Sequence, residues 1–572
     1  MNKFIKEIID ILKEKVDLSL EELERTIEVP PEEKLGDYAF PCFILSKKLK
    51  KPPDKIASEL SGQIKPKELI EKIYSIGPYV NFKVDGSKLA QEVLSQICKQ
   101  KESYGGDESG KGKTMVIEFS SPNIAKPFGV GHLRSTVIGN ALYNLYKHLG
   151  YKCIRLNHLG DWGTQFGTLI VAFKKWGDEK KLKSDPINTL YDLYVKFHHE
   201  SERNPDLEDE ARVWFKKLEQ KDKETTVLWK RFKEYSIKEF QRIYQILGIE
   251  FDSFAGESFY DQFIDSTIEK IKKAGLTQIS QEALIVDLEE YDLPACLLRK
   301  KDGATLYATR DITAAIYRYN TYHFHKLLYV VGSAQKLHFQ QVFKVLELLG
   351  CPWTKDLVHV DFGWILFKEK VTSARRKVMS TRRGSIVLLE DVLNRSVDLA
   401  LKIIQEKNPE LEDREKVAFD VGIGAVIFAD LSTRRQKDVN FDWEEVLNFE
   451  GQSGPYIQYT HARLCSLMRK YDKPMGKDID YDLLKSEDEY SIAKSLLDFP
   501  RQIRLAAESY EPSVICSYLL ELCFIFNRYY QKERIITSDE ASTRARMLLV
   551  KGTQTVVKNG LAILGIKAPE KM

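Results

Sequence analysis

The stretch TMVIEFSSPNIAKPFGVGHLRS, residues 114–135, sets the fold of the central part of the chain. It begins with TMVIEF, a short apolar run that predicts a buried β-strand. From His132 onward apolar residues recur with helical spacing as far as Gly150, which predicts a helix with a glycine stop. KCIRLN (152–157) then predicts a second strand, so residues 114–157 are expected to form a strand–loop–helix–strand unit of a parallel sheet.

A second unit of this type is predicted later in the chain. LLYVVG (327–332) and a strand around LVHVDF are joined by a helix expected from about Ala334 to Leu349. We therefore predict the α/β class: a Rossmann-type doubly wound parallel sheet whose two halves meet at a ligand crevice. The predicted domains are an N-terminal α+β domain (1–110), the first half of the sheet (111–167), a mostly helical insertion (168–280), the second half (281–394) and an all-helical domain (395–572).

Composition limits the possible classes of protein. The 572 residues carry a net charge of only +3, with 43% hydrophobic and 30% charged residues, as in a globular protein. The sequence contains no run of about 18 apolar residues, so no membrane role is predicted. Glu7, Asp10 and Glu14 argue against a transit peptide at the N-terminus. A cytoplasmic location is therefore expected. The eight cysteines lack metal-ligand spacing, and neither a disulfide framework nor a protein metal site is predicted.

The loop before the predicted helix has a composition typical of a phosphate site. A helix N-terminus presents unpaired N–H groups, Lys126 and His132 add donors, and Gly129 and Gly131 allow close backbone approach. The loop matches neither the Walker pattern nor GxGxxG, so another nucleotide-binding family is required. A plainer alternative is a tight turn with His132 as a helix cap. The basic run RRKVMSTRR (375–383) is either a solvated face or an ordered loop.

Several motifs resemble class I aminoacyl-tRNA synthetases. FGVGHLRS (128–135) resembles their "HIGH" signature, and KVMSTRRG (377–384) resembles their "KMSKS" loop. Arginyl-tRNA synthetases in particular are similar in four stretches that appear here in the same order. These are EFSSPNIAKPF (118–128), NHLGDWGTQFG (157–167), LYATRD (306–311) and GPYIQYTHAR (454–463). The resemblance covers essentially the whole chain.

This resemblance implies a two-step reaction. L-arginine and ATP, with Mg²⁺ accompanying the ATP, form arginyl-adenylate, and the arginyl group then moves to the terminal ribose of tRNA(Arg). Family members usually need bound tRNA for the first step, and a monomer is expected. The rivals are another class I ligase or nucleotidylyltransferase, and a catalytically weak tRNA-binding paralogue.

The resemblance also assigns the ATP site, with two departures from the family pattern. Gly129 replaces the first His of "HIGH", and Thr381 replaces the second Lys of "KMSKS". Lys126 occupies the position thought to compensate for the missing lysine, although a loop lysine is often merely solvated. The implied catalytic residues are Lys126, His132, Ser380, Thr381 and Arg382, and the implied ATP contacts are Gly129, Gly131, His132 and Met379.

For arginine, the resemblance implies that two carboxylates, Glu118 and Asp311, bind the guanidinium, with Tyr307 beside it. Planar guanidinium suits bidentate carboxylate contacts better than lysine's ammonium does. Alternatively, Asp311 occupies an early helical turn and Glu118 only ends a strand. The substrate's α-amino and carboxylate end is assigned to Ser121, Asn123 and Gln335.

The tRNA contacts implied by the resemblance lie at both ends of the chain. The N-terminal domain is expected to meet the tRNA elbow and the helical C-terminal domain the anticodon. Exposed aromatic rings stack on unpaired RNA bases, although burial is the commoner fate of an aromatic side chain. The assigned residues are Asn81, Phe82, Tyr530 and Met572.

Overall fold

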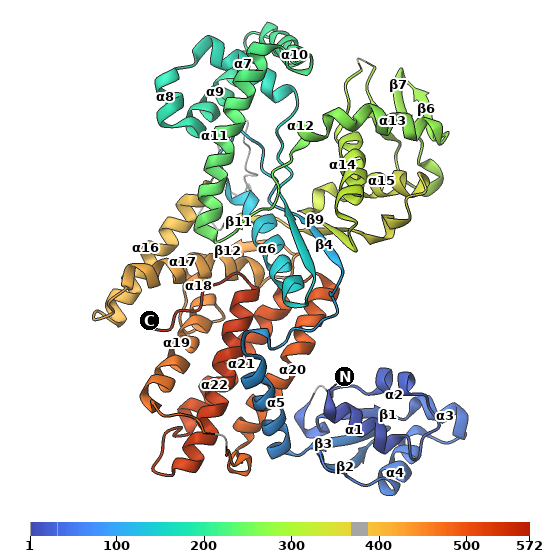
Figure 1. Ribbon diagram of the computed structural model, residues 1–572, viewed down its shortest axis with the longest axis vertical. Helices are drawn as coiled ribbons and strands as arrows, with labels where there is room; N and C mark the ends of the chain where they lie inside the picture. The colour runs from blue at the N-terminus through green and yellow to red at the C-terminus, as the bar shows by residue number, and fades with distance from the viewer. Residues whose placement is uncertain (1, 31, 302, 368–386, 477) are drawn as a thin grey trace, which may run out of the picture. The chain divides into compact units, whose positions relative to one another are not determined.

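The computed structural model describes residues 2–30, 32–301, 303–367, 387–476 and 478–572 (Figure 1). The chain divides into two compact units. The first comprises Met1–Tyr104, Leu464–Phe499 and Leu522–Val556, and the second comprises Gly105–Arg463, Pro500–Glu521 and Val557–Met572. Among the described residues, no helix combines the length and apolar character that crossing a membrane requires.

A four-stranded parallel sheet organises the second unit. Its strands are β4 (Thr114–Glu118), β5 (Lys152–Leu156), β9 (Lys326–Gly332) and β10 (Leu357–Phe362), in the order β10-β9-β4-β5. The chain leaves β4 for its neighbour β5 on one side and later returns at β9 on the other. The point where strand order reverses therefore lies between β4 and β9, the usual ligand crevice of such sheets.

Helices cover this sheet because its strands are apolar on both faces. Val116, Leu327 and Tyr329 share a buried cluster with residues of α14 (Tyr307–Tyr322) and α15 (Lys336–Leu348). Side chains alternate along a strand, so the intervening Met115 and Ile117 point to the opposite face, and they too are buried. The helix α6 (Leu133–His148) packs against β4, β5 and β9. The predicted doubly wound sheet is confirmed.

The segment between the two halves of the sheet is largely helical. Five helices pack together (Figure 1), and apolar residues of three of them, the first, third and fourth in chain order, form a separate small core. They are α7 (Thr164–Trp176), α8 (Glu179–Ser184), α9 (Pro186–Ser201), α10 (Asp206–Glu219) and α11 (Lys223–Leu247). After them come α12 (Glu257–Tyr260), α13 (Ile264–Lys273) and an antiparallel sheet of β6 (Thr277–Ser280), β7 (Ala283–Val286) and β8 (Cys296–Arg299).

The region beyond the second half of the sheet is mostly helical, with one short strand that the sequence pattern did not predict. The strand β12 (Val439–Phe441) pairs in parallel with β11 (Ile365–Phe367). Its hydrogen-bonding partner therefore lies far earlier in the chain. The helices are α16 (Leu389–Lys407), α17 (Arg414–Leu431), α18 (Trp443–Val446), α19 (Gly454–Tyr471), α20 (Glu487–Ser509), α21 (Ser513–Lys532) and α22 (Glu540–Ile563).

The N-terminal part of the first unit is an α+β fold. A three-stranded antiparallel sheet has the order β1-β3-β2, with β1 (Tyr38–Pro41), β2 (Ile70–Ile76) and β3 (Tyr79–Val84). Its helices are α1 (Lys3–Leu12), α2 (Leu20–Thr26), α3 (Phe43–Leu49), α4 (Pro53–Gln63) and α5 (Gly86–Gln100).

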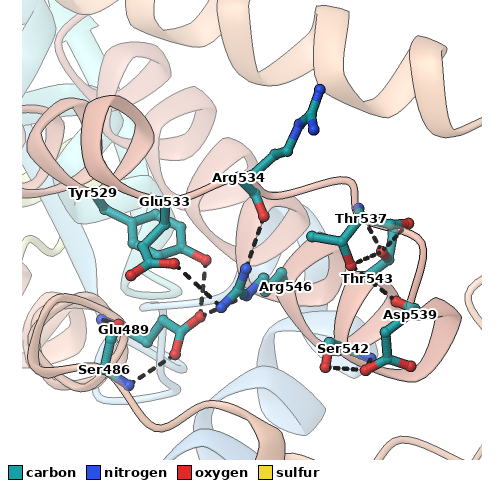
Figure 2. Close-up of polar contacts among 10 residues, drawn as sticks. All are labelled: Ser486, Glu489, Tyr529, Glu533, Arg534, Thr537, Asp539, Ser542, Thr543 and Arg546. Atoms are coloured by element: carbon teal, nitrogen blue, oxygen red, sulfur yellow. Dashed lines mark hydrogen bonds and ion pairs between the residues drawn. The ribbon is translucent and has the colours of Figure 1, made fainter.

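The C-terminal helices of the first unit are joined by a polar network centred on Arg546 (Figure 2). The Arg546 guanidinium donates to Glu489 Oε1 at 3.0 Å and to the main-chain oxygen of Arg534 at 2.7 Å. The Tyr529 hydroxyl donates to the same Glu489 oxygen at 2.9 Å, while the main-chain N–H of Ser486 donates to Oε2 at 2.9 Å. Glu489 therefore caps the start of α20 and also ties it to α21 and α22.

The glycine-rich stretch 102–113 is a packed segment. Tyr104 is only 1% exposed, and its hydroxyl donates to the main-chain oxygen of Leu496 at 2.9 Å. At Gly110, an added Cβ would lie 2.2 Å from the Tyr151 ring. Glycine is needed here for close packing against Tyr151. The composition of the stretch alone does not show whether its glycines provide flexibility or allow such packing.

Candidate functional site

The predicted substrate residues lie at the carboxyl edge of the parallel sheet. Glu118 is the last residue of β4 and pairs in register with Tyr329 of β9, across the point where strand order reverses. Gln335 ends the turn Ser333–Gln335 that leads from β9 into α15, and His158, which is not among the predicted residues, follows β5. Residues distant in sequence therefore converge where parallel-sheet proteins bind ligands.

The loop after β4 has a strained backbone. Ser120, Ser121 and Ala125 all have positive φ, at 69°, 48° and 60°, which is unfavourable for residues with a Cβ. Hydrogen bonds hold this shape: the Ser120 N–H donates to Ser135 Oγ at 2.8 Å, and the Ala125 N–H donates to Ser236 Oγ at 2.8 Å. Such strain is concentrated at functional sites, where surrounding contacts maintain it.

A second loop packs directly against the first. The main-chain N–H of Ile124 donates to Gly160 O at 3.2 Å, and the Gly160 N–H donates to Pro122 O at 3.1 Å. An added Cβ on Gly160 would lie 2.0 Å from Asn123 Oδ1, so this position requires glycine. Asn123 is exposed and Ser121 half-buried, which leaves both side chains accessible to a ligand.

The "HIGH"-like loop leads into α6 through a short turn, Val130–His132. Burial, helped by the nearby Lys126 cation, lowers the pKa of His132 to about 4, so the imidazole is neutral at pH 7. Lys126 Nζ lies 4.7 Å from the centre of the Tyr194 ring. Gly129 is buried, whereas Gly131 is exposed with open space around it. A neutral imidazole and a lysine cation thus lie close together at the start of a helix.

The residues after the "KMSKS"-like loop are anchored to the "HIGH"-like loop. The Val130 N–H donates to Val387 O at 3.0 Å, and the Leu389 N–H donates to Phe128 O at 2.9 Å. Gly129 and Leu388 form an antiparallel bridge between these segments. Met379, Ser380, Thr381 and Arg382, assigned to ATP and catalysis, lie outside the described residues.

Glu118 is already paired with a cation of the protein. Its Oε2 lies 2.5 Å from Nη1 of Arg318 on α14, and the two side chains are 7% and 1% exposed. The Arg318 guanidinium also donates to the Tyr260 hydroxyl at 3.3 Å. The sequence predicted that Glu118 accepts hydrogen bonds from the substrate guanidinium. In the structure this carboxylate already contacts the guanidinium of Arg318.

Asp311 lies between two histidines. Its Oδ2 accepts from His338 Nε2 at 2.6 Å, and its Oδ1 lies 3.8 Å from His158 Nε2. Burial alone would raise the pKa of Asp311, but the His338 hydrogen bond and the positive groups nearby outweigh it and hold that pKa below its ordinary value. Asp311 is therefore an ionised, oriented carboxylate.

A second buried acidic group, Glu257, interacts electrostatically with Asp311. Burial raises the pKa of Glu257 to about 8, and the carboxylates of Asp311 and Asp161 act in the same direction, against the Arg310 cation. Glu257 is therefore protonated at pH 7, which limits the net negative charge around Asp311. Tyr307, one turn before Asp311 on α14, is 63% exposed, so its ring is open to a ligand.

The residues assigned to tRNA contact differ in how far their side chains are exposed. Asn81 and Phe82 of β3 are 1% and 0% exposed. Base stacking requires an exposed ring, so the stacking expected of Phe82 is not available in this fold. Tyr530, near the end of α21, is 36% exposed, and the main-chain oxygen of Met572 accepts from Asn408 Nδ2 at 3.1 Å.

Three residues in this region were not predicted from the sequence: Arg318, His158 and His338. Helical spacing was an available signal for two of them, because Arg318 is seven residues after Asp311 on one face of α14, and His338 is three residues after Gln335, which directly precedes α15. Within the described residues, no group of three or more His, Cys, Asp or Glu side chains is placed to hold a metal ion.

Comparisons with known proteins cover the whole chain. Residues 93–443 match the family described as tRNA synthetases class I (R), catalytic domain; residues 457–572 match the DALR anticodon binding domain, and residues 2–84 the arginyl tRNA synthetase N terminal domain. The arginine–tRNA ligases of Halothermothrix orenii and Clostridioides difficile are 49% and 50% identical over 573 residues, covering 100% of each chain. The arginyl-tRNA synthetase structure from Thermus thermophilus superposes with a TM-score of 0.82 at 26% identity, covering 100% of this chain and 99% of that one.

Proposed function

The chain belongs to the class I arginyl-tRNA synthetases and is an arginine–tRNA ligase that uses ATP, and we propose here how its residues divide the two steps of that reaction. The observation that carries the proposal is the convergence of Asp311, Glu118 and the start of α6 at the carboxyl edge of one sheet. Amino acid and triphosphate would thus lie side by side.

Asp311 is the main acceptor for the arginine guanidinium in this proposal. It is ionised and partly accessible, with 21% of its side chain exposed, whereas the charge of Glu118 is already compensated by Arg318. A bidentate guanidinium–carboxylate contact discriminates against lysine and citrulline. Lysine lacks the planar pair of N–H donors, and citrulline lacks the positive charge. Glu118 contributes by holding Arg318, and Tyr307 covers the guanidinium from its exposed position.

Activation of arginine requires no general base. The substrate carboxylate is already a nucleophile, so catalysis rests on aligning it with the α-phosphate of ATP and on stabilising charge on the phosphate oxygens. His132, neutral at pH 7, donates one hydrogen bond there, and Lys126 supplies the cation that Thr381 cannot. Ser121, Asn123 and Gln335 orient the α-amino and carboxylate end. Mg²⁺ would accompany the triphosphate and help to neutralise its charge.

The tRNA is proposed to contact domains at both ends of the chain. The N-terminal domain (1–110) meets the elbow of tRNA(Arg), and the helical domain (395–572) meets its anticodon, with Tyr530 and Met572 among the contacts. The enzyme acts as a monomer in the cytoplasm, where arginine, ATP and tRNA are present together.

The proposal is tested by tRNA-dependent attachment of radiolabelled arginine. We expect Lys126→Ala to slow adenylate formation by orders of magnitude with little change in the arginine KM, since Lys126 is assigned to phosphate and not to arginine. Lys196→Ala, which removes another lysine that stacks on an aromatic ring (Trp176, 4.9 Å), is the matched control and should leave the rate unchanged. A wild-type rate for Lys126→Ala would remove Lys126 from the mechanism.

A further inference from the structure

A continuous chain of charged and polar groups links the two carboxylates at this site. Glu118 Oε2 lies 2.5 Å from Arg318 Nη1, and Arg318 Nη2 lies 3.2 Å from His158 Nδ1. On its other side the His158 ring faces Asp311, whose second oxygen meets His338. The four elements involved are β4, the loop after β5, α14 and α15, so the chain exists only in the folded protein.

The donor chemistry of arginine fixes the tautomer of His158. A guanidinium has donors only, so His158 Nδ1 must accept the hydrogen bond from Arg318. The ring proton of His158 then sits on Nε2, which faces Asp311 Oδ1 at 3.8 Å. The buried Arg318–Glu118 pair therefore determines which edge of His158 is turned toward Asp311.

His338 approaches Asp311 from the opposite side. An ionised carboxylate only accepts, so His338 Nε2 donates to Asp311 Oδ2 across 2.6 Å. One imidazole N–H thus faces each oxygen of Asp311. A carboxylate has about four acceptor positions, so two remain for a bidentate guanidinium while both histidines stay in place.

His338 also connects the two ends of the expected substrate. It lies in the first turn of α15, three residues after Gln335, which directly precedes that helix, and its partner Asp311 lies on α14. A single hydrogen bond therefore fixes the spacing between the guanidinium acceptor and the residue assigned to the α-amino and carboxylate end. A carboxylate held by only one weak contact at 3.8 Å could rotate away from this geometry.

We propose that His338 is a positioning residue for arginine selection, which holds the Asp311 carboxylate in the orientation that accepts the substrate guanidinium. The inference rests on the proposed role of Asp311 in binding arginine. His338 itself needs no contact with the substrate. Its effect is confined to arginine affinity, because ATP and tRNA contact other parts of the chain.

The test is steady-state aminoacylation at saturating ATP and tRNA with two variants of His338. In His338→Leu the donor is lost, and we expect the arginine KM to rise about 10- to 100-fold, the range that follows from losing a hydrogen bond to a charged group. The kcat and the KM values for ATP and tRNA should stay within about twofold. His338→Gln, whose amide nitrogen reaches the Nε2 position, should restore most of the arginine affinity.

His359→Leu is the matched control. His359 lies on β10, half-buried, donating from Nε2 to Val331 O at 2.9 Å with its ring 4.5 Å from Phe339, so it is a histidine of similar surroundings without a link to Asp311. It should lower the unfolding temperature without a selective change in arginine KM. An equal rise in arginine KM for His338→Gln and His338→Leu would overturn the proposal, as would an unchanged KM in both.

A double-mutant cycle separates this inference from the proposed function. If Asp311→Asn alone leaves the arginine KM unaltered, the assignment of Asp311 fails, whatever His338 does. If Asp311→Asn raises the KM, we expect Asp311→Asn/His338→Leu to be no worse than Asp311→Asn alone, because His338 acts through Asp311. Additive effects would show that His338 acts elsewhere. Should His338→Leu not fold, His338→Asn, too short to reach Asp311, replaces it in the cycle.

Discussion

Two arginine-centred networks in this protein use the same chemistry for different ends. Around Arg546, in the first unit, the partners include main-chain groups: the guanidinium bonds to the main-chain oxygen of Arg534, and its partner Glu489 accepts from the main-chain N–H of Ser486 (Figure 2). Around Arg318, in the second unit, the described partners are all side chains. The first network closes helix ends, whereas the second orients side chains.

The two networks differ in whether their acidic groups are fully occupied by partners within the protein. In the Arg546 network both oxygens of Glu489 accept hydrogen bonds from within the protein, so the contacts serve stability. In the Arg318 network the chain of contacts ends at Asp311, an ionised carboxylate that is 21% exposed. In the proposed arginine site, the outermost carboxylate is therefore left to bind the substrate while the inner members of the network hold it in place.

The largest effect is expected from removing the buried cation. Arg318→Met would leave Glu118 as an uncompensated buried carboxylate, which should lower the free energy of unfolding by about 3–5 kcal/mol, measured by urea denaturation. The double variant Arg318→Met/Glu118→Leu is the control and should recover most of the loss. A loss below about 1 kcal/mol in the single variant would show that the pair is not buried as described.

The next effect should appear in arginine binding alone. Asp311→Asn keeps the shape of the side chain and removes its charge, so the arginine KM should rise about 10- to 100-fold with little change in the unfolding temperature. Glu489→Gln, the same change in the other network, should lower the unfolding temperature and leave the arginine KM as it is. A reversal of these two results would contradict the distinction between the networks.

A smaller loss is expected at Arg546. Its side chain is 18% exposed, so Arg546→Met should lower the free energy of unfolding by about 2 kcal/mol, less than Arg318→Met, because water replaces part of what is lost. Thermal and urea unfolding measure this. A rise in the arginine KM matching that of Asp311→Asn would mean that the Arg546 network also serves the substrate.

The smallest effect concerns His132, a partly buried titratable group whose Nδ1 is shielded from solvent. Its pKa is about 4 in the folded chain and 6.5 when unfolded, so between these values the unfolded chain binds more protons. The free energy of unfolding should therefore fall as the pH falls through this window, with about 1 kcal/mol lost from His132 between pH 7 and 5.5. His132→Gln should flatten this part of the pH–stability curve. An unchanged slope would contradict the burial of the imidazole.

The elements of the central sheet were predictable because their signals are local. The apolar run that begins at residue 114, the helical spacing after His132 and the strand and helix patterns of the second unit each arise from residues within one element, and the predicted strands and helices form. The strand β12 escaped prediction because only the distant β11 gives it a partner. Phe82 was expected at a surface because its motif suggested RNA contact, but its side of β3 faces the core.

Sequence by itself determined the family of the protein and predicted which residues would carry its chemistry, namely the loop before α6 and the carboxylates Glu118 and Asp311. Tertiary structure alone decided that Glu118 is paired with Arg318 and that Asp311 is held by His338. The physical reason is that helix and strand formation depends on neighbours a few residues apart, whereas these contacts join side chains from β4, α14 and α15. Only the packing of both helices on the sheet brings those side chains within hydrogen-bonding distance.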